Sequence, residues 1–150
     1  MSTTYQTVGQ AIFNLMNGID VSTITGLPAP GWAETHNYPP KQVRSYPSFA
    51  VVPAEDAEDP MDAITDDDRV TYWVYITASY QDSSDAEDQL RRLVDLVRTR
   101  VRQQKRSATP LGGGGAYALG RLGGAWGANV DQGERFYRLS IEAKVDQSLV

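Results

Sequence analysis

Apolar residues recur along this chain with two different periods, and each period predicts one kind of element. In residues 4–17 and 85–104 they recur every three or four positions, which is typical of a helix with one buried face. Ser84 and Glu87 have the S-x-x-E spacing of a capping box at the start of the second helix. Gly18 directly follows the first helix, and we expect it to end that helix in a left-handed conformation.

Residues 69–80 show the clearest strand pattern, because two sets of side chains alternate there with period two. The set expected to face the core consists of Val70, Tyr72, Val74, Ile76 and Ala78. The opposite face carries Trp73 and Tyr75, which is unusually aromatic for a surface in contact with water. We therefore predict that both rings lie under a helix or at a contact with another subunit.

Three further strands are expected. Residues 48–52 lie between Pro47 and Pro53, which mark the strand ends because proline cannot donate to a sheet ladder. Residues 134–145 alternate clearly, and the glycine-weakened residues 122–132 are expected to form a hairpin with them. The order helix, strand, strand, helix, strand, strand predicts an α+β fold, in which a mainly antiparallel four-stranded sheet packs against two helices.

Long loops are expected within this single α+β domain of residues 1–150. Residues 18–47 are rich in proline and glycine, residues 54–68 hold eight carboxylates, and residues 107–127 hold 8 of the 13 glycines. The aromatic residues expected to pin the first of these loops to the core or to a neighbour are Trp32, Tyr38 and Tyr46. The early part of the glycine-rich segment is expected to be flexible.

Composition and charge narrow the function classes. The chain has no cysteine and one histidine, which excludes a disulfide scaffold, a thiolate zinc site and a cysteine nucleophile. Its net charge of −5 combines 3 basic and 14 acidic side chains in residues 1–90 with 11 basic and 5 acidic ones in residues 91–150. This asymmetry indicates either contacts between copies of the chain or two solvated faces of a monomer.

Candidate chemical motifs fail on their spacing. The four glycines of residues 112–115 are followed by no lysine and preceded by a predicted helix, so they do not match a phosphate-binding loop. The acidic residues 54–68 contain no glycine and lack the ligand spacing of a calcium loop. A catalytic triad with His36 would need a nucleophilic serine, and the sequence contains no G-x-S-x-G motif that supplies one. We therefore expect no enzyme activity, no cofactor and no metal site.

Nucleic-acid binding is not expected either. An acidic chain attracts phosphate weakly, and the basic residues of the second helix have no aromatic residues among them. Those basic residues either complement the helix dipole or form a docking surface. The remaining unusual features, an aromatic outer strand face, two irregular loops and a polarised charge, favour a subunit of an assembly over a catalyst.

The order of segments resembles the tail terminator (tail-completion) proteins of long-tailed bacteriophages. The resemblance runs through the N-terminal helix, the proline-containing strand segment 46–52, the acidic loop and the aromatic strand 70–76. It continues through the helix 85–104 and the closing strand 136–145. It covers nearly the whole chain, except that the glycine-rich residues 107–127 have no counterpart.

The resemblance implies a structural virion protein that forms a homo-oligomeric ring, usually a hexamer. Such a ring caps the tail tube, ends its polymerisation and joins the tail to the head. The implied partners are further copies, the tail tube protein and the head–tail connector or stopper protein. DNA only passes through the lumen, no membrane is involved, and the virion neck is assembled in the host cytoplasm. The alternatives are another neck component, such as a connector or stopper, or a small non-viral binding module.

Candidate residues follow from these patterns. Contacts with another subunit or partner are expected at Trp73, Tyr75, Arg98, Arg102, Arg106, Tyr117 and Trp126. Acidic side chains expected to face the lumen or a loop are Glu55, Asp56, Glu58, Asp59, Asp66, Asp67 and Asp68. An acidic lumen would avoid holding DNA by phosphate attraction.

Overall fold

A computed structural model describes the backbone of residues 4–58, 67–78, 84–106, 116–129 and 134–146. Within these ranges, side chains are not described for residues 4–5, 55–58, 67–68, 116–118, 121, 129, 134 and 145–146. The helices are α1 (Thr4–Asn17) and α2 (Ser84–Lys105). The strands are β1 (Glu34–His36), β2 (Ser48–Glu58), β3 (Asp67–Thr77), β4 (Ala116–Asn129) and β5 (Glu134–Asp146).

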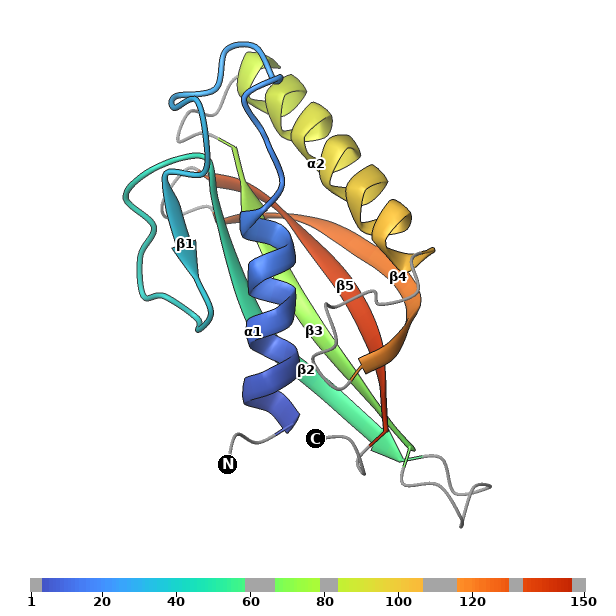
Figure 1. Cartoon of the computed structure of the whole chain (residues 1–150). Helices are drawn as coiled ribbons and strands as arrows, with labels where there is room; N and C mark the ends of the chain where they lie inside the picture. The colour runs from blue at the N-terminus through green and yellow to red at the C-terminus, as the bar shows by residue number, and fades with distance from the viewer. Residues whose placement is uncertain (1–3, 59–66, 79–83, 107–115, 130–133, 147–150) are drawn as a thin grey trace.

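The predicted α+β class is confirmed, with both helices packed on a mainly antiparallel open sheet. The described strands lie in the order β1-β2-β3-β5-β4. All neighbouring pairs are antiparallel except β1 and β2, so the sheet is mixed. Figure 1 shows α1 and α2 in front of the same face of the sheet. Neither described helix is long and apolar enough to cross a membrane.

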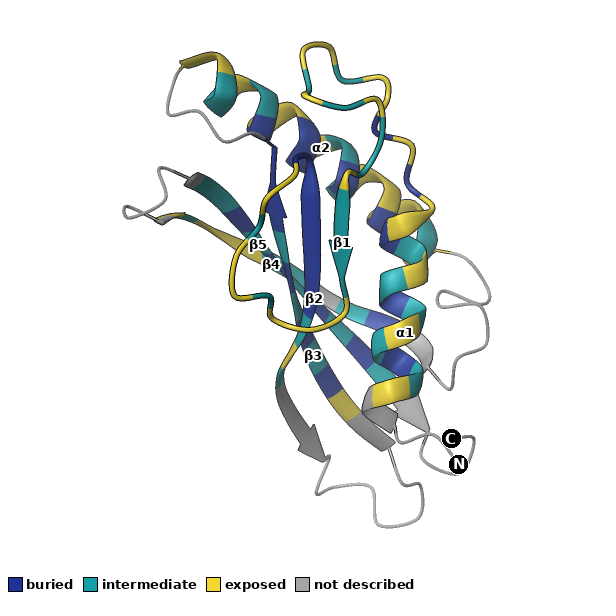
Figure 2. Ribbon diagram, turned by 90° about the vertical axis from the view of Figure 1, so that its left-hand side faces the viewer, coloured by how far each residue is buried: buried dark blue, intermediate teal, exposed yellow. Residues whose placement is uncertain are grey.

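The core lies between that face and the two helices. Residues of α1 at helical spacing, such as Val8 and Ile12, meet the inward side chains of β2, and α2 covers β3, β4 and β5. The inward set expected for residues 69–80 is confirmed as buried, at 1% exposure or less: Val70, Tyr72, Val74 and Ile76 of β3, and Ala78 just beyond it. Figure 2 shows the buried stripe of each helix turned toward the sheet.

The predicted number of four strands is wrong, because the described residues alone form five, with β1 as the unexpected one. This three-residue strand pairs in parallel with β2, from Glu34 opposite Ser48 to His36 opposite Ala50. The Ala33 N–H also donates to the Pro47 carbonyl oxygen at 2.8 Å. So short a strand carries no periodic signal of its own. It forms because the loop before β2 returns along the edge of β2.

Proline does not end β2 as expected. The strand continues through Pro53 to Glu58, with a shift in its pairing to β3 between Pro53 and Glu55. Proline is tolerated on an edge strand, and past Ala50 no other described strand pairs with the outer side of β2. Both ends of the predicted acidic loop 54–68 are therefore wrong. Five of its eight carboxylates lie in strand backbone, namely Glu55, Asp56, Glu58, Asp67 and Asp68.

Strand β4 overturns much of the predicted glycine-rich loop. It begins at Ala116 and pairs with β5, with shifts in register between Ala116 and Ala118 and between Leu119 and Leu122. This confirms the hairpin but not its expected start at residue 122. The glycines make room for β5 side chains. A Cβ atom would collide with Glu142 at Gly120, with the Tyr137 hydroxyl at Gly124, and with the Phe136 ring at Gly127. These glycines therefore reflect close cross-strand packing and not a loop.

Two of the three aromatic residues expected to hold the segment between α1 and β2 against the core, Trp32 and Tyr46, do so. The Trp32 indole N–H donates to the Met16 carbonyl oxygen at 3.0 Å, and its ring packs on Phe49 at 4.9 Å between centroids. Tyr46 is 7% exposed, whereas Tyr38 is 56% exposed. The expectation for Gly18 is wrong. Its N–H donates to the Asn14 carbonyl oxygen at 3.0 Å, and the left-handed glycine is Gly26, at φ 89°.

Candidate interaction surface

The sheet face opposite the helices, here called the outer face, carries a cluster of aromatic side chains. The centroids of Trp73 and Tyr75 lie 6.4 Å apart, and those of Tyr75 and Phe136 lie 5.7 Å apart. Arg138 places its guanidinium carbon 4.1 Å from the centroid of the Trp73 ring. Register explains this contact: Arg138 stands opposite Tyr75 on β3, so its long side chain reaches the diagonal neighbour Trp73.

The predicted helix over Trp73 and Tyr75 is absent among the described residues, because α1 and α2 both lie on the opposite face. Both aromatic side chains are half-buried. Part of that cover comes from the loop 39–43, which lines a groove together with these two rings. The predicted contact with another subunit remains a prediction.

A groove separates the loop 39–43 from the outer face and is called the outer-face groove below. Its volume is about 330 Å³, within the lower range of ligand pockets. One wall is formed by Pro39, Pro40, Lys41, Gln42 and Val43. The other is formed by Ser48, Phe49, Ala50, Val52, Trp73, Tyr75, Thr77 and Phe136. Lys41 is the one charged residue in this lining, so the groove suits an apolar or aromatic group.

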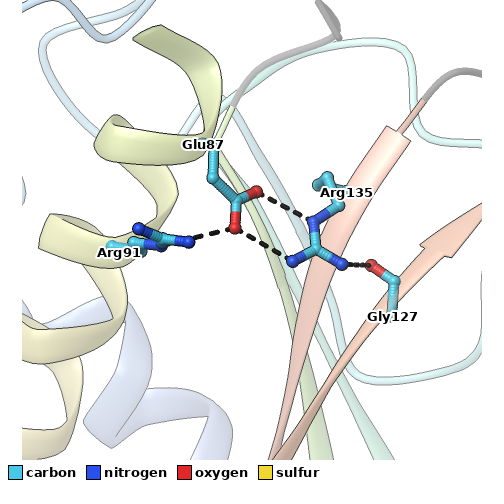
Figure 3. Close-up of polar contacts among 4 residues, drawn as sticks. All are labelled: Glu87, Arg91, Gly127 and Arg135. Carbon is cyan, nitrogen blue, oxygen red and sulfur yellow. Dashed lines mark hydrogen bonds and ion pairs between the residues drawn. The ribbon is translucent and has the colours of Figure 1, made fainter. Parts of the chain in front are cut away.

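On the helix-covered side, an ion-pair cluster joins α2 to the edge hairpin (Figure 3). The guanidinium of Arg135 on β5 donates to both carboxylate oxygens of Glu87, at 2.8 and 2.9 Å. Arg135 also donates to the Gly127 carbonyl oxygen at 3.4 Å, and Arg91 lies 3.4 Å from the same carboxylate. Hydrogen bonds from Arg135 are the main reason that the pKa of Glu87 is lowered from its ordinary value.

This cluster changes the role expected for Glu87. The capping-box pattern assigns the Glu87 carboxylate to the backbone N–H of Ser84. In the structure the carboxylate binds Arg135, which is 48 residues away in the chain. A bidentate arginine–carboxylate pair has two charge-assisted hydrogen bonds, which makes it stronger than a bond to one backbone N–H.

Trp126 projects from β4 beside this cluster. Its side chain is 45% exposed, although its ring contacts Tyr137 edge-on at 4.8 Å between centroids. The guanidinium carbon of Arg135 lies 6.0 Å from the Trp126 ring. Tyr137 is held in turn by Arg98, whose Nη1 donates to the tyrosine hydroxyl at 2.5 Å. Trp126 is therefore an exposed aromatic residue on a fixed support.

The structure distributes the predicted contact residues over two faces. Arg98 and Trp126 meet through Tyr137 on the helix-covered side, whereas Trp73 and Tyr75 lie on the outer face. Arg102 lies exposed in the last turn of α2, where a positive charge complements the helix dipole, and Arg106 lies exposed just beyond that turn. The backbone of Tyr117 is in β4, and its side chain is outside the described residues.

The predicted acidic surface is only partly described. Glu55, Asp56 and Glu58 are placed by their backbone in β2, and Asp67 and Asp68 by theirs in β3. The remaining two predicted residues, Asp59 and Asp66, lie outside the described residues. Whether these carboxylates face a lumen stays a prediction.

Sequence reasoning missed Phe136, Arg138 and the Glu87–Arg135 pair. Alternation along β5 places Phe136 and Arg138 on one face and could have flagged both. Their meeting with Trp73 and Tyr75 depends on the pairing of β3 with β5, which alternation alone does not reveal. The contact between Glu87 and Arg135 depends on how α2 lies across the sheet.

His36 and Glu34 bind each other within the segment that contains β1. The Nε2 atom of His36 lies 2.9 Å from a Glu34 carboxylate oxygen, and the other oxygen of Glu34 accepts a hydrogen bond from the Arg44 N–H. Within the part of the chain that the structure describes, no three histidine, cysteine, aspartate or glutamate side chains cluster so as to hold a metal ion.

Neither the comparison with protein-family models nor the comparison with curated proteins gives a match for this chain.

Proposed function

We propose that this protein is a structural virion subunit of a long-tailed bacteriophage. Its copies form a closed ring, usually of six, that caps the tail tube, ends tube polymerisation and joins the tail to the head connector. The resemblance in segment order to tail terminator proteins supports this role. The observation that carries the proposal is the outer face, where an aromatic cluster and an apolar groove are covered by neither α1 nor α2. Aromatic side chains that stay partly accessible beside a groove suit a contact with another protein.

The polar groups near these surfaces support a role in binding over a role in catalysis. Glu87 and Arg135 neutralise each other, and Arg98 is bound to the Tyr137 hydroxyl. Arg138 lies against the Trp73 ring. Each of these side chains positions a neighbour and is thereby engaged within the subunit. The groove itself offers apolar walls and one lysine, which suits another protein surface.

The proposal is tested by measuring assembly of the purified protein with and without the tail tube protein of the same phage. Native mass spectrometry should detect a closed ring of 16.5-kDa subunits, either free or once tube is added. Tubes grown with the protein should stop early and carry the ring at one end in electron micrographs. A protein that stays monomeric and leaves tube ends bare would refute the proposal. A ring that binds the connector but not the tube would indicate another neck component.

The acidic segment is expected to face the lumen of this ring. Residues 54–68 hold eight carboxylates, and negative charge would keep DNA from binding as it passes. Replacing the eight carboxylates by serine should leave the ring intact but make it retain DNA at low salt, measured by co-sedimentation with double-stranded DNA. An intact ring of the serine variant that retains no more DNA than the natural ring would refute this assignment.

A further inference from the structure

We propose that a single strand of nucleic acid binds to this protein where the C-terminal half of α2 lies beside the β4–β5 hairpin. The phosphates of the strand contact Arg98, Arg102 and Lys105, and one base stacks on Trp126. These four residues are called the basic corner below. The inference goes beyond the proposed ring and does not depend on it, because the basic corner lies within one subunit.

The two halves of α2 differ in their charge balance. In residues 84–95, two carboxylates pair with arginines four positions further along the helix. Residues 98–106 hold five basic side chains and no acidic one. Arg102 and Lys105 are exposed and form no ion pair with any described residue. These two side chains therefore carry positive charge that no described carboxylate neutralises.

The basic residues of the second half form a row on the flank of α2 that faces the hairpin. Arg98, Arg102 and Lys105 are spaced by four and three residues, so they lie on the same side of the helix. Arg98 identifies that side, because its Nη1 donates to the hydroxyl of Tyr137 on β5. Like charges four residues apart destabilise a helix, and the helix dipole acts mainly within the last turn, about one turn beyond Arg98. Helix stability therefore does not explain the whole row.

Described carboxylates elsewhere in α2 and in β3 do not cancel this row. Asp95 lines a pocket with the loop after α1, on the other flank of α2. Glu87 accepts hydrogen bonds on both carboxylate oxygens from the guanidinium of the ion-pair cluster. Asp68 of β3 pairs with Val145, eight residues beyond Tyr137 and roughly 26 Å away at about 3.3 Å per residue. Charges at that distance are screened at physiological salt, where the Debye length is about 8 Å.

Trp126 supplies an aromatic ring beside the row. Strand register places Trp126 opposite Tyr137, and the two rings meet edge-on at 4.8 Å between centroids. Tyr137 thus contacts both Trp126 and Arg98. Trp126 is 45% exposed, so part of the indole is open to a ligand. The sequence predicted no aromatic residue among the basic residues of α2, and only the pairing of β4 with β5 brings one there.

A nucleic-acid strand uses the basic corner more fully than an acidic protein segment does. Each nucleotide carries a phosphate and a flat base, so one strand engages the basic row and the indole together. Carboxylates of a protein pair with the basic row alone. A duplex keeps its bases paired and stacked, and exposing one of them costs free energy. The basic corner should therefore prefer a single strand.

The test measures binding of the natural full chain to a fluorescently labelled oligo(dT) strand of about 20 nucleotides, which is longer than such a site requires. Fluorescence anisotropy should show binding at about 50 mM salt that weakens as salt rises. Each phosphate contact to a single strand contributes about −0.7 to the slope of the logarithm of the binding constant against the logarithm of salt concentration. Three contacts therefore predict a slope of about −2. Oligo(U) of equal length distinguishes RNA from DNA as the ligand, and binding of either supports the proposal.

Two changes separate stacking from charge. Trp126→Ala should weaken binding about tenfold and leave the salt slope unchanged, because it removes a stacked base but no phosphate contact. Arg102→Gln combined with Lys105→Gln should weaken binding at least about tenfold and bring the slope to about −0.7. Trp126→Phe retains an aromatic ring and should bind within about threefold of the natural chain.

Arg100→Gln is the matched charge control. Arg100 is exposed on the same helix, but it interacts with Asp20 on the other flank, so its loss should leave binding nearly unchanged. Circular dichroism spectra that match the natural chain show that weaker binding by a variant is not caused by unfolding.

Several results would overturn this inference. They are no binding of either strand at low salt, unchanged affinity of Trp126→Ala, and equal weakening by Arg100→Gln and by the double variant. A duplex that binds as tightly as the strand would exclude base stacking. Poly-L-glutamate that displaces the strand at equal charge concentration would indicate a surface for an acidic protein instead. The proposed ring is tested by assembly and stands or falls separately from these measurements.

Discussion

The two faces of the sheet are built from the same strands but carry different chemistry. On the helix-covered face, Ile76 and Leu139 are fully buried among aliphatic side chains of α1 and α2. On the outer face, the adjacent residues Tyr75 and Arg138 are half-buried in an aromatic cluster beside a groove. The chain therefore completes its core on one face only. The described part of the chain leaves the large aromatic residues of the outer face half-buried.

The largest effect should come from testing this contrast at adjacent positions of β3. Ile76→Ala is expected to lower the free energy of unfolding by about 2–5 kcal/mol, because it leaves a cavity in a fully buried site. Tyr75→Ala removes a half-buried ring from the outer face and should cost about 1–2 kcal/mol. Urea denaturation of the monomer measures both. Equal losses would mean that the outer face is as much a part of the core as the helix-covered face.

A second comparison uses two adjacent glycines of β4. Gly124→Ala should destabilise the fold by about 1–3 kcal/mol, because the new methyl group collides with Tyr137 on the helix-covered face. Gly123 pairs with Ser140 on the outer face and has nothing within 4 Å of a built Cβ, so Gly123→Ala should change stability by less than about 0.5 kcal/mol. Thermal denaturation measures the difference. A harmless Gly124→Ala would show that Tyr137 does not lie over β4.

The smallest effect concerns the ion-pair cluster on the helix-covered side. Glu87→Gln should reduce stability at neutral pH by about 0.5–1 kcal/mol, because the pair with Arg135 is only partly shielded from water. Asp88→Asn is the control, since Asp88 and Arg92 form a pair whose side chains are both 59% exposed. Asp88→Asn should lower the free energy of unfolding by at most about 0.5 kcal/mol.

The contribution of Glu87 should also depend on pH. Its pKa is lowered in the folded state, mainly by hydrogen bonds from Arg135, so the ionised carboxylate is favoured by folding. The stabilisation is present above the ordinary glutamate pKa of 4.5 and is lost as the pH falls through the lower folded value. Natural protein and Glu87→Gln should therefore become equally stable in acid. A constant difference between them down to pH 3 would contradict this assignment.

Much of the fold could be predicted because its signals are local. Apolar periodicity placed α1 and α2 to within a residue, and alternation identified the inward face of β3. The failures involve backbone pairing. Pro53 was expected to end β2, but an edge strand has no need of the missing N–H. The glycines of β4 indicated a loop, since nothing in the chain shows that Tyr137 and Phe136 lie over them.

In the candidate interaction surface, too, local features could be predicted from the sequence, whereas contacts between distant segments could not. The sequence by itself determined that Trp73 and Tyr75 share one face of a strand, because a strand turns successive side chains to opposite sides. It also determined the polarised charge and the exclusion of cysteine chemistry. Only the tertiary structure decided that α1 and α2 cover the same face, so that neither described helix lies over those rings. Strand register then brought Arg138 and Phe136 to the rings, and helix placement brought Glu87 to Arg135 across 48 residues. These contacts join distant parts of the chain, and no local pattern encodes their pairing.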